Sequence, residues 1–195
     1  MSSQPFQKQY LRAEALSLVR KAETDGQLLD KAVEKYHQYL SLNPHDDNAW
    51  GGLGGAYRRK GDVDKALDSY CKAYEANPQS TYALVNIVSL RAARNLEEDR
   101  EKLKTEIPEA LRLCQQAIQK NTEDFWTWYD IATLQLIAGN LNQALSDFNY
   151  AIKLTPETAK ENFRSVLNNL KFLQSHNPTI EGLSTVIRMI SEHLT

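Results

Sequence analysis

Apolar residues recur along most of the chain at intervals of three and four positions, the spacing of amphipathic helices. Residues 47–80 contain two such segments, separated by Gly61 and closed by Pro78. Their regularly spaced positions are Trp50, Leu53, Gly54, Tyr57, Ala66, Tyr70 and Ala73. Large residues on one segment are matched by small residues on the other, so the two helices can approach closely. The pattern predicts an antiparallel helix hairpin and an all-α fold.

The hairpin pattern recurs in register along the chain. Residues 13–46 and 125–158 carry it at the same offsets as residues 47–80, and residues 81–124 carry it with extra residues near 96–105. We expect four hairpins over 1–158, with a helical extension at 1–12. Residues 159–195 lack the pattern but contain two amphipathic stretches, which we interpret as capping helices.

The extra residues near 96–105 are rich in charge and contain neither Gly nor Pro. We weigh two interpretations of this insertion, a solvated helical extension or loop and a projecting contact element for a partner. Pro108 then fits the first turn of the helix that follows. Asn95 stands where the other hairpins have Gly61 and Gly139, and asparagine tolerates the left-handed conformation that such a turn needs.

The repeated unit resembles the tetratricopeptide repeat family. The resemblance rests on Trp50, Leu53, Gly54, Tyr57, Ala66, Tyr70, Ala73 and Pro78 and on their counterparts in the other hairpins. It implies a right-handed superhelical solenoid of antiparallel helix hairpins with C-terminal capping helices. It also implies a non-catalytic module or adaptor that docks a partner peptide or helix in a concave groove lined by the first helix of each hairpin.

The groove positions of that family indicate candidate partner-binding residues. They are Gly51, Gly55, Arg58, Tyr82, Trp126 and Tyr129. Trp and Tyr anchor many interfaces because they bury much area at low rotamer cost. Trp126 has no core role in the pattern, although it could also pack against the insertion or a neighbouring helix. Gly51 and Gly55 either open space for a ligand or are tolerated irregularities in the helix. Arg58 either binds an anionic group or complements a helix C-terminus.

A second resemblance covers residues 81–95, the insertion, residues 124–140 and residues 162–173. This combination is similar to the tetratricopeptide region called the TRAF-binding domain, which occurs in certain MAP kinase kinase kinases and in bacterial multidomain signalling proteins. The resemblance implies an adaptor or scaffold segment that serves signalling by recruiting or regulating an effector domain. It does not indicate a ligand.

Composition and charge narrow the possible functions. The formal net charge is −2, so we expect no nucleic-acid partner, and no stretch has the length and apolar character of a membrane span. The histidines and the two cysteines form no metal-site or nucleophile–base motif, so we expect no metal, cofactor or catalysis. We therefore expect a cytoplasmic binding protein. The alternative is a self-associating scaffold segment that buries Ile180, Val186, Ile187 and Ile190, or the N-terminal aromatics Phe6 and Tyr10, against a second copy.

Overall fold

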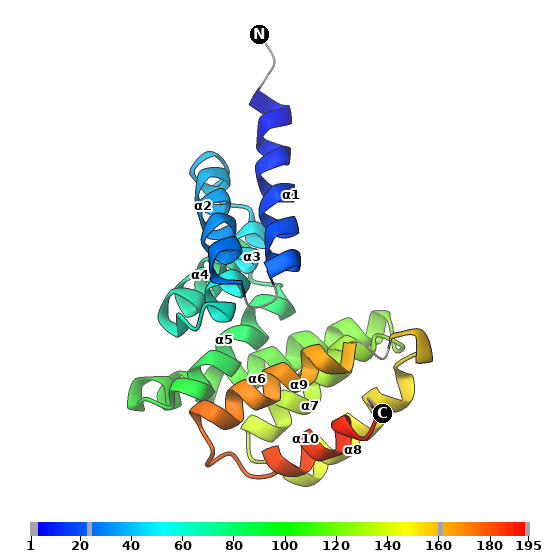
Figure 1. Ribbon diagram of the computed structural model, residues 1–195. Helices are drawn as coiled ribbons and strands as arrows, with labels where there is room; N and C mark the ends of the chain where they lie inside the picture. Colours follow the sequence, from blue (N-terminus) through cyan, green and yellow to red (C-terminus); the bar gives the residue numbers. More distant parts are fainter. Residues whose placement is uncertain (1–3, 23–24, 160–161, 194–195) are drawn as a thin grey trace. The chain divides into compact units, whose positions relative to one another are not determined.

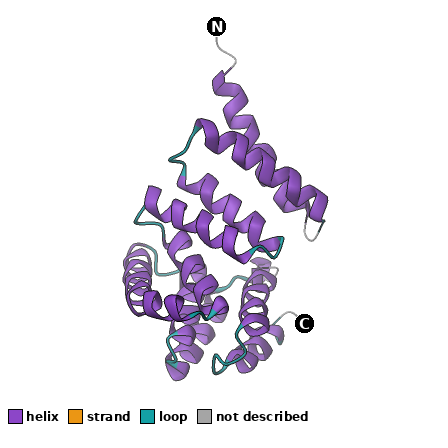
Figure 2. Ribbon diagram, turned by 90° about the vertical axis from the view of Figure 1, so that its left-hand side faces the viewer, coloured by secondary structure: helices purple, strands orange, loops and turns teal. Residues whose placement is uncertain are grey.

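The computed structural model describes residues 4–22, 25–159 and 162–193, and these residues form helices joined by short loops (Figures 1 and 2). As predicted, the fold is all-α and is built from antiparallel helix hairpins. The chain divides into two compact units, 1–87 and 88–195. The division falls inside one helix, α5, rather than between the repeats and the expected capping helices.

Unit 1 consists of two hairpins and the first part of α5. Its helices are α1 (Gln4–Ala22), α2 (Gly26–Leu42), α3 (Asp47–Arg59), α4 (Val63–Ala76) and α5 (Thr81–Arg94). Helix α1 packs on α2 and α3 packs on α4, while α2 also contacts α3 and so joins the two hairpins. The expected N-terminal extension is part of α1, and the side chain of Phe6 lies outside the described residues.

Aspartate side chains set the start of several helices. Asp25, Asp46 and Asp62 precede α2, α3 and α4, and Asp124 precedes α7, and each carboxylate accepts backbone N–H groups of the first turn. Each cap of this kind stabilises a helix by about 0.5–2 kcal/mol, because those N–H groups have no partner inside the helix.

Turn residues close the hairpins as the sequence predicts. Gly61 and Gly139 have φ angles of 79° and 81°, and Asn95 adopts the same left-handed region with a φ of 51°. The indole of Trp50 donates to the Pro44 carbonyl at 2.7 Å, and that of Trp128 donates to the Thr122 carbonyl at 3.1 Å. The hairpins at 47–80 and 125–158 therefore share local contacts as well as a sequence pattern.

Unit 2 contains the end of α5 and the helices that follow it. These are α6 (Glu97–Lys120), α7 (Phe125–Ile137), α8 (Leu141–Leu154), the short 3-10 helix η1 (Glu157–Ala159), α9 (Asn162–His176) and α10 (Leu183–Ser191). Helix α7 packs on α6 and α8, and α9 packs on α10. Their buried apolar residues form one core that includes Ala92, Tyr129, Phe148, Leu170 and Ile190.

The insertion continues α6 toward its N-terminus and adds no loop. Helix α6 starts at Glu97, so Pro108 lies in its interior and not in its first turn, which corrects the sequence-based placement. Most side chains of the insertion are exposed, but Asp99 is fully buried. A purely solvated extension is therefore not what the structure shows.

The C-terminal helices bury the residues of one of the two expected self-association interfaces. Val186 and Ile190 are 0% exposed, and Ile180 and Ile187 are partly buried against the core of unit 2. Gly182, with a φ of 85°, precedes α10. Tyr10, in contrast, is 67% exposed on α1.

Candidate partner-binding surfaces

Four glycines on α3 face tyrosine rings, which gives most of them a packing role that the sequence pattern did not reveal. A Cβ atom on Gly52 would lie 2.6 Å from Cζ of Tyr36, and one on Gly54 would lie 2.9 Å from the Tyr70 ring. A Cβ on Gly51 would lie 3.1 Å from the Tyr82 ring. At Gly55 the nearest atom is the Tyr70 hydroxyl at 3.6 Å, an ordinary contact. The space that Gly51 leaves is thus occupied by a ring of the chain itself.

Tyr82 is a fixed aromatic side chain on the surface of unit 1. It is 56% exposed, and its ring meets the Tyr70 ring edge-on at 5.8 Å and 73°. The two hydroxyl oxygens lie 3.3 Å apart. Tyr70 is buried, and burial raises the pKa of its phenol well above the ordinary value, so this phenol stays neutral near pH 7. Tyr82 is therefore held by contacts on one side while its other side faces solvent.

Asn86 links Arg58 to Tyr82 by two hydrogen bonds. Its Nη1 donates to Asn86 Oδ1 at 3.2 Å, and Asn86 Nδ2 donates to the Tyr82 carbonyl at 2.8 Å. Burial lowers the pKa of the Arg58 guanidinium, but arginine keeps its charge at neutral pH. We name Gly51, Gly55, Arg58, Tyr82 and Asn86 the α3–α5 surface. Three kinds of group meet there, a cation, an aromatic ring and a carboxamide.

Tyr129 does not have the exposed position that the groove pattern predicts. It is 3% exposed, its hydroxyl lies 3.1 Å from Thr155 Oγ1, and the Phe163 ring of α9 meets it edge-on at 6.3 Å. Burial raises its pKa to about 12. Tyr129 is therefore a core residue of unit 2, and the correction removes it from the candidate partner contacts.

Helix α9 packs over Tyr129, one of the two predicted groove residues of unit 2. Its buried residues are Phe163, Val166, Leu167, Leu170 and Leu173, and they share one core cluster with Tyr129, Leu136 and Ala92. The Asn177 side chain, just after α9, donates to the Ala92 carbonyl at 2.8 Å. Helix α9 is the orange helix of Figure 1. Because α9 lacks the repeat signature, its position over this core was not predictable from the repeat pattern.

Trp126 keeps a surface position on α7. It is 40% exposed, its ring lies 5.3 Å from that of Phe125, and its backbone N–H donates to Asp124 Oδ1 at 3.2 Å.

Asp130, one helical turn further along α7, is partly buried. Burial, together with the nearby Asp124 charge, raises the pKa of Asp130 to about 7. Burial and the Asp130 charge also raise the pKa of Cys114 to about 12, so this thiol is unreactive.

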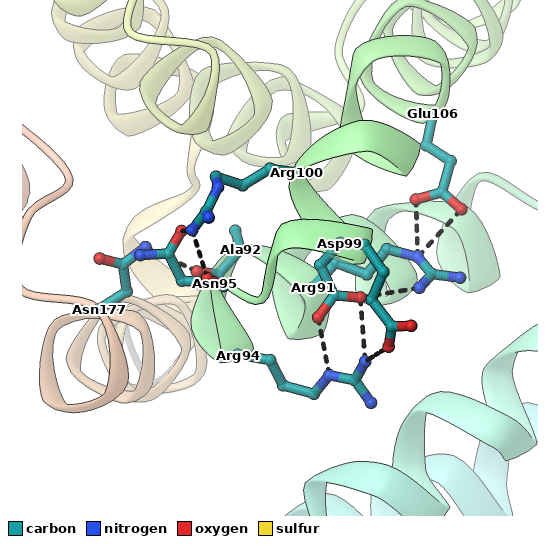
Figure 3. A network of polar contacts seen from close by, with 9 residues as sticks. Arg91, Ala92, Arg94, Asn95, Asp99, Arg100, Glu106 and Asn177 are labelled. Carbon is teal, nitrogen blue, oxygen red and sulfur yellow. Dashed lines mark hydrogen bonds and ion pairs between the residues drawn. The ribbon is translucent and has the colours of Figure 1, made fainter.

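A charged network joins α5 to the insertion (Figure 3). Asp99 accepts a hydrogen bond from Arg91 Nη1 at 2.9 Å and one from Arg94 Nε at 2.8 Å, and Glu106 accepts from Arg91 Nε at 3.0 Å. Burial opposes ionisation of Asp99, but the two arginines outweigh it and hold its pKa below the ordinary value. Glu98 pairs with Arg94 at 3.0 Å on the exposed side of the network. The network anchors the insertion to α5.

Comparisons with known proteins agree with the hairpin architecture. A sequence model of the family described as "Tetratricopeptide repeat" matches residues 13–81. The chain is 41% identical over 61 residues to Tetratricopeptide repeat protein 37 of Xenopus laevis, and 26% identical over 146 residues to Superkiller protein 3 of Schizosaccharomyces pombe. These matches cover 31% and 75% of this chain but only 4% and 10% of the two relatives.

Solved structures support the fold. The tetratricopeptide protein TTC0263 of Thermus thermophilus superposes with a TM-score of 0.56 at 18% identity, covering 93% of this chain and 99% of that one. The structure titled "MamA MSR-1 C2" superposes with a TM-score of 0.52 at 16% identity, covering 96% and 98%. The fold is therefore of the tetratricopeptide type.

Other kinds of site are not seen in the part of the chain that the structure describes. Within residues 4–22, 25–159 and 162–193, no group of three His, Cys, Asp or Glu side chains is arranged to hold a metal ion. None of the described helices has both the length and the apolar character needed to cross a membrane.

Proposed function

We propose that the chain is a non-catalytic protein-interaction module that docks a segment of a partner protein on the α3–α5 surface, with Trp126 as a further anchor on unit 2. The proposal rests on the ring of Tyr82, which is exposed to solvent but held in place by Tyr70. A ring that is fixed before binding loses little conformational entropy when a partner covers it.

The neighbours of Tyr82 supply polar contacts beside this apolar anchor. The Arg58 guanidinium can bind carbonyl or carboxylate oxygens, and Asn86 holds it near the Tyr82 backbone. Gly51 gives the Tyr82 ring room to lie against α3, and Gly55 leaves the adjoining backbone open to an incoming segment. An extended or helical peptide presenting an apolar side chain next to an acceptor group would complement this surface.

An affinity-capture experiment tests the proposal. The wild-type chain, Tyr82→Ala and Tyr150→Ala are immobilised at equal density and exposed to the same native lysate. Tyr150 is the matched control because it is also an exposed tyrosine, 44% exposed, but lies on α8, the second helix of its hairpin. We expect Tyr82→Ala to reduce capture at least tenfold and Tyr150→Ala to leave it unchanged. Equal capture by all three proteins would contradict the proposal.

The second resemblance adds a finer hypothesis. If the chain is an adaptor of the TRAF-binding type, the captured protein is an effector of a signalling complex, and capture followed by mass spectrometry identifies it. Self-association is the alternative function, and the exposure of Tyr10 and Leu16 on α1 favours it most specifically. Light scattering over a range of concentrations separates the two, because a stable monomer excludes the alternative.

A further inference from the structure

Trp126 and Asp130 occupy adjacent turns on the same side of α7. They are four residues apart, a spacing that places side chains one above the other, about 5–6 Å apart at Cβ. Trp126 is 40% exposed and Asp130 is partly buried. Tyr129, Ala132 and Leu136 of α7 belong to the core of unit 2, and Leu134, one turn beyond Asp130, is 0% exposed, so the exposed strip of α7 ends at Asp130. The pair therefore forms a small surface on unit 2, an aromatic face beside a carboxylate.

The carboxylate of Asp130 has no counter-charge within the described part of the chain. None of the described residues forms an ion pair or a hydrogen bond with it. The charged group that acts on it is Asp124, which has the same sign. Asp124 itself serves as the N-cap of α7, because its carboxylate accepts the backbone N–H of Trp126 and the hydroxyl of Thr127. Asp130 performs no comparable structural task.

We infer that this surface binds a cationic side chain, arginine or lysine, of a basic segment of the partner protein. The aliphatic stem and the charged head of such a side chain can lie across the indole of Trp126, and the head can pair with the Asp130 carboxylate. Cations favour the faces of tryptophan rings, and a partly desolvated carboxylate gains more from a cation than a fully solvated one does. The inference rests on the proposed function. It specifies the chemistry of the partner segment that contacts unit 2.

Other occupants fit this surface poorly. An acidic segment would be repelled by Asp130 and Asp124 together. A purely apolar segment would cover Trp126 but would also remove the remaining water from a carboxylate without supplying a partner, which is costly. Charge complementarity therefore favours the basic segment, and the acidic and neutral segments become controls of the test.

A peptide-binding titration tests the inference. Three fluorescein-labelled peptides of equal length, alternating alanine with arginine, glutamine or glutamate, are titrated with the full chain and followed by fluorescence anisotropy at pH 8. The protein variants are Asp130→Asn, Trp126→Ala and Glu181→Gln. Glu181 is the matched control, since it is an exposed acidic residue of unit 2 in the segment between α9 and α10.

We expect the arginine peptide to bind more tightly than the other two, and Asp130→Asn and Trp126→Ala each to weaken it at least fivefold. Glu181→Gln should leave its affinity unchanged. Equal binding of the three peptides, or equal loss in Asp130→Asn and Glu181→Gln, would overturn the inference. Circular dichroism melts confirm that the variants are folded, and Trp126→Phe, which keeps an aromatic face, should retain most of the affinity.

The two proposals fail in different ways. If the arginine peptide does not bind selectively but Tyr82→Ala still abolishes lysate capture, the basic ligand is wrong and the interaction function stands. If lysate capture is indifferent to Tyr82→Ala, the proposed docking surface itself is wrong.

Discussion

The Tyr36 side chain fills the position beside α3 that a side chain at Gly52 would need, with only 2.6 Å between its Cζ atom and an ideal Cβ. Tyr36 is 2% exposed and so has little freedom to move away. This close approach joins α2 to α3 across the boundary of two hairpins, and it explains why a helix tolerates a residue of low helix propensity at this position.

Gly52→Ala should therefore destabilise the protein, whereas Gly55→Ala should not. Overpacking a core site typically costs about 1–3 kcal/mol, which exceeds the gain of up to about 1 kcal/mol from replacing a helical glycine. A Cβ atom on Gly55 would lie 3.6 Å from its nearest neighbour, the Tyr70 hydroxyl. The gain in helix propensity therefore remains, and we expect Gly55→Ala to stabilise the protein. Urea unfolding of the two variants measures both effects, and destabilisation of equal size at the two positions would contradict the explanation.

Asp99→Asn should destabilise unit 2 strongly. Removing one partner of a buried ion pair costs up to about 3–5 kcal/mol, and we expect a value below that limit because Arg91, almost fully buried, keeps its pair with Glu106. Glu101→Gln is the control, since Glu101 pairs with Lys104 in solvent and such pairs contribute about 0–1 kcal/mol. Chemical denaturation measures the change in the free energy of unfolding for each variant. A loss below about 1 kcal/mol for Asp99→Asn would show that the network does not anchor the insertion.

The Asp99 network also predicts loss of stability in acid. The pKa of Asp99 is lower in the folded protein than its ordinary value, so the folded state favours the ionised carboxylate. Its contribution is complete above the unfolded-state pKa and disappears as the pH falls through the folded-state value. Between pH 5 and pH 2, wild type should lose more stability than Asp99→Asn, as measured by thermal melts. Parallel losses would contradict this role.

The raised pKa of Asp130 should make the protein less stable as the pH rises, the opposite of the effect of Asp99. Its folded-state pKa of about 7 lies above its ordinary value of 3.8, so the folded protein binds the proton more tightly than the unfolded chain. The stability that this group contributes is therefore lost as the pH rises from about 4 through 7. Asp130→Asn should be more stable than wild type at pH 8, and the difference should shrink toward pH 4. Denaturation at several pH values measures the difference, and a variant less stable at pH 8 would show that Asp130 has a stabilising partner.

The architecture was predictable from the sequence because hairpin geometry depends on local patterns. The small and large residues of each hairpin and the left-handed turn at Asn95 are local features. Placement of α9 depends on tertiary packing against Tyr129 and Ala92, which no local pattern encodes. The burial of Tyr129 was therefore missed.

The candidate surfaces were predictable only in part. Tyr82 and Trp126 were identifiable because they are large aromatic residues at positions with no core role. The tyrosine partners of the α3 glycines come from other helices, α2, α4 and α5, so the repeat pattern, which accounts for Gly54, left Gly51, Gly52 and Gly55 unexplained. Asp130 carried no signal, because its distinguishing feature is the lack of a cation around it in the described part of the fold. Asp99 was hidden within a run of charges whose pattern predicts a solvated segment.

Hydrogen exchange of the protein with its captured partner tests the central claim most directly. Amide protection is compared with and without the partner, helix by helix. We predict that binding slows exchange in α3 and the first turns of α5, around Gly55 and Asn86, and in the first turns of α7 near Trp126. Helices α4 and α8 should be unaffected. Protection confined to α4 and α8, with α3, α5 and α7 unchanged, would contradict the claim that the first helices of the hairpins carry the partner.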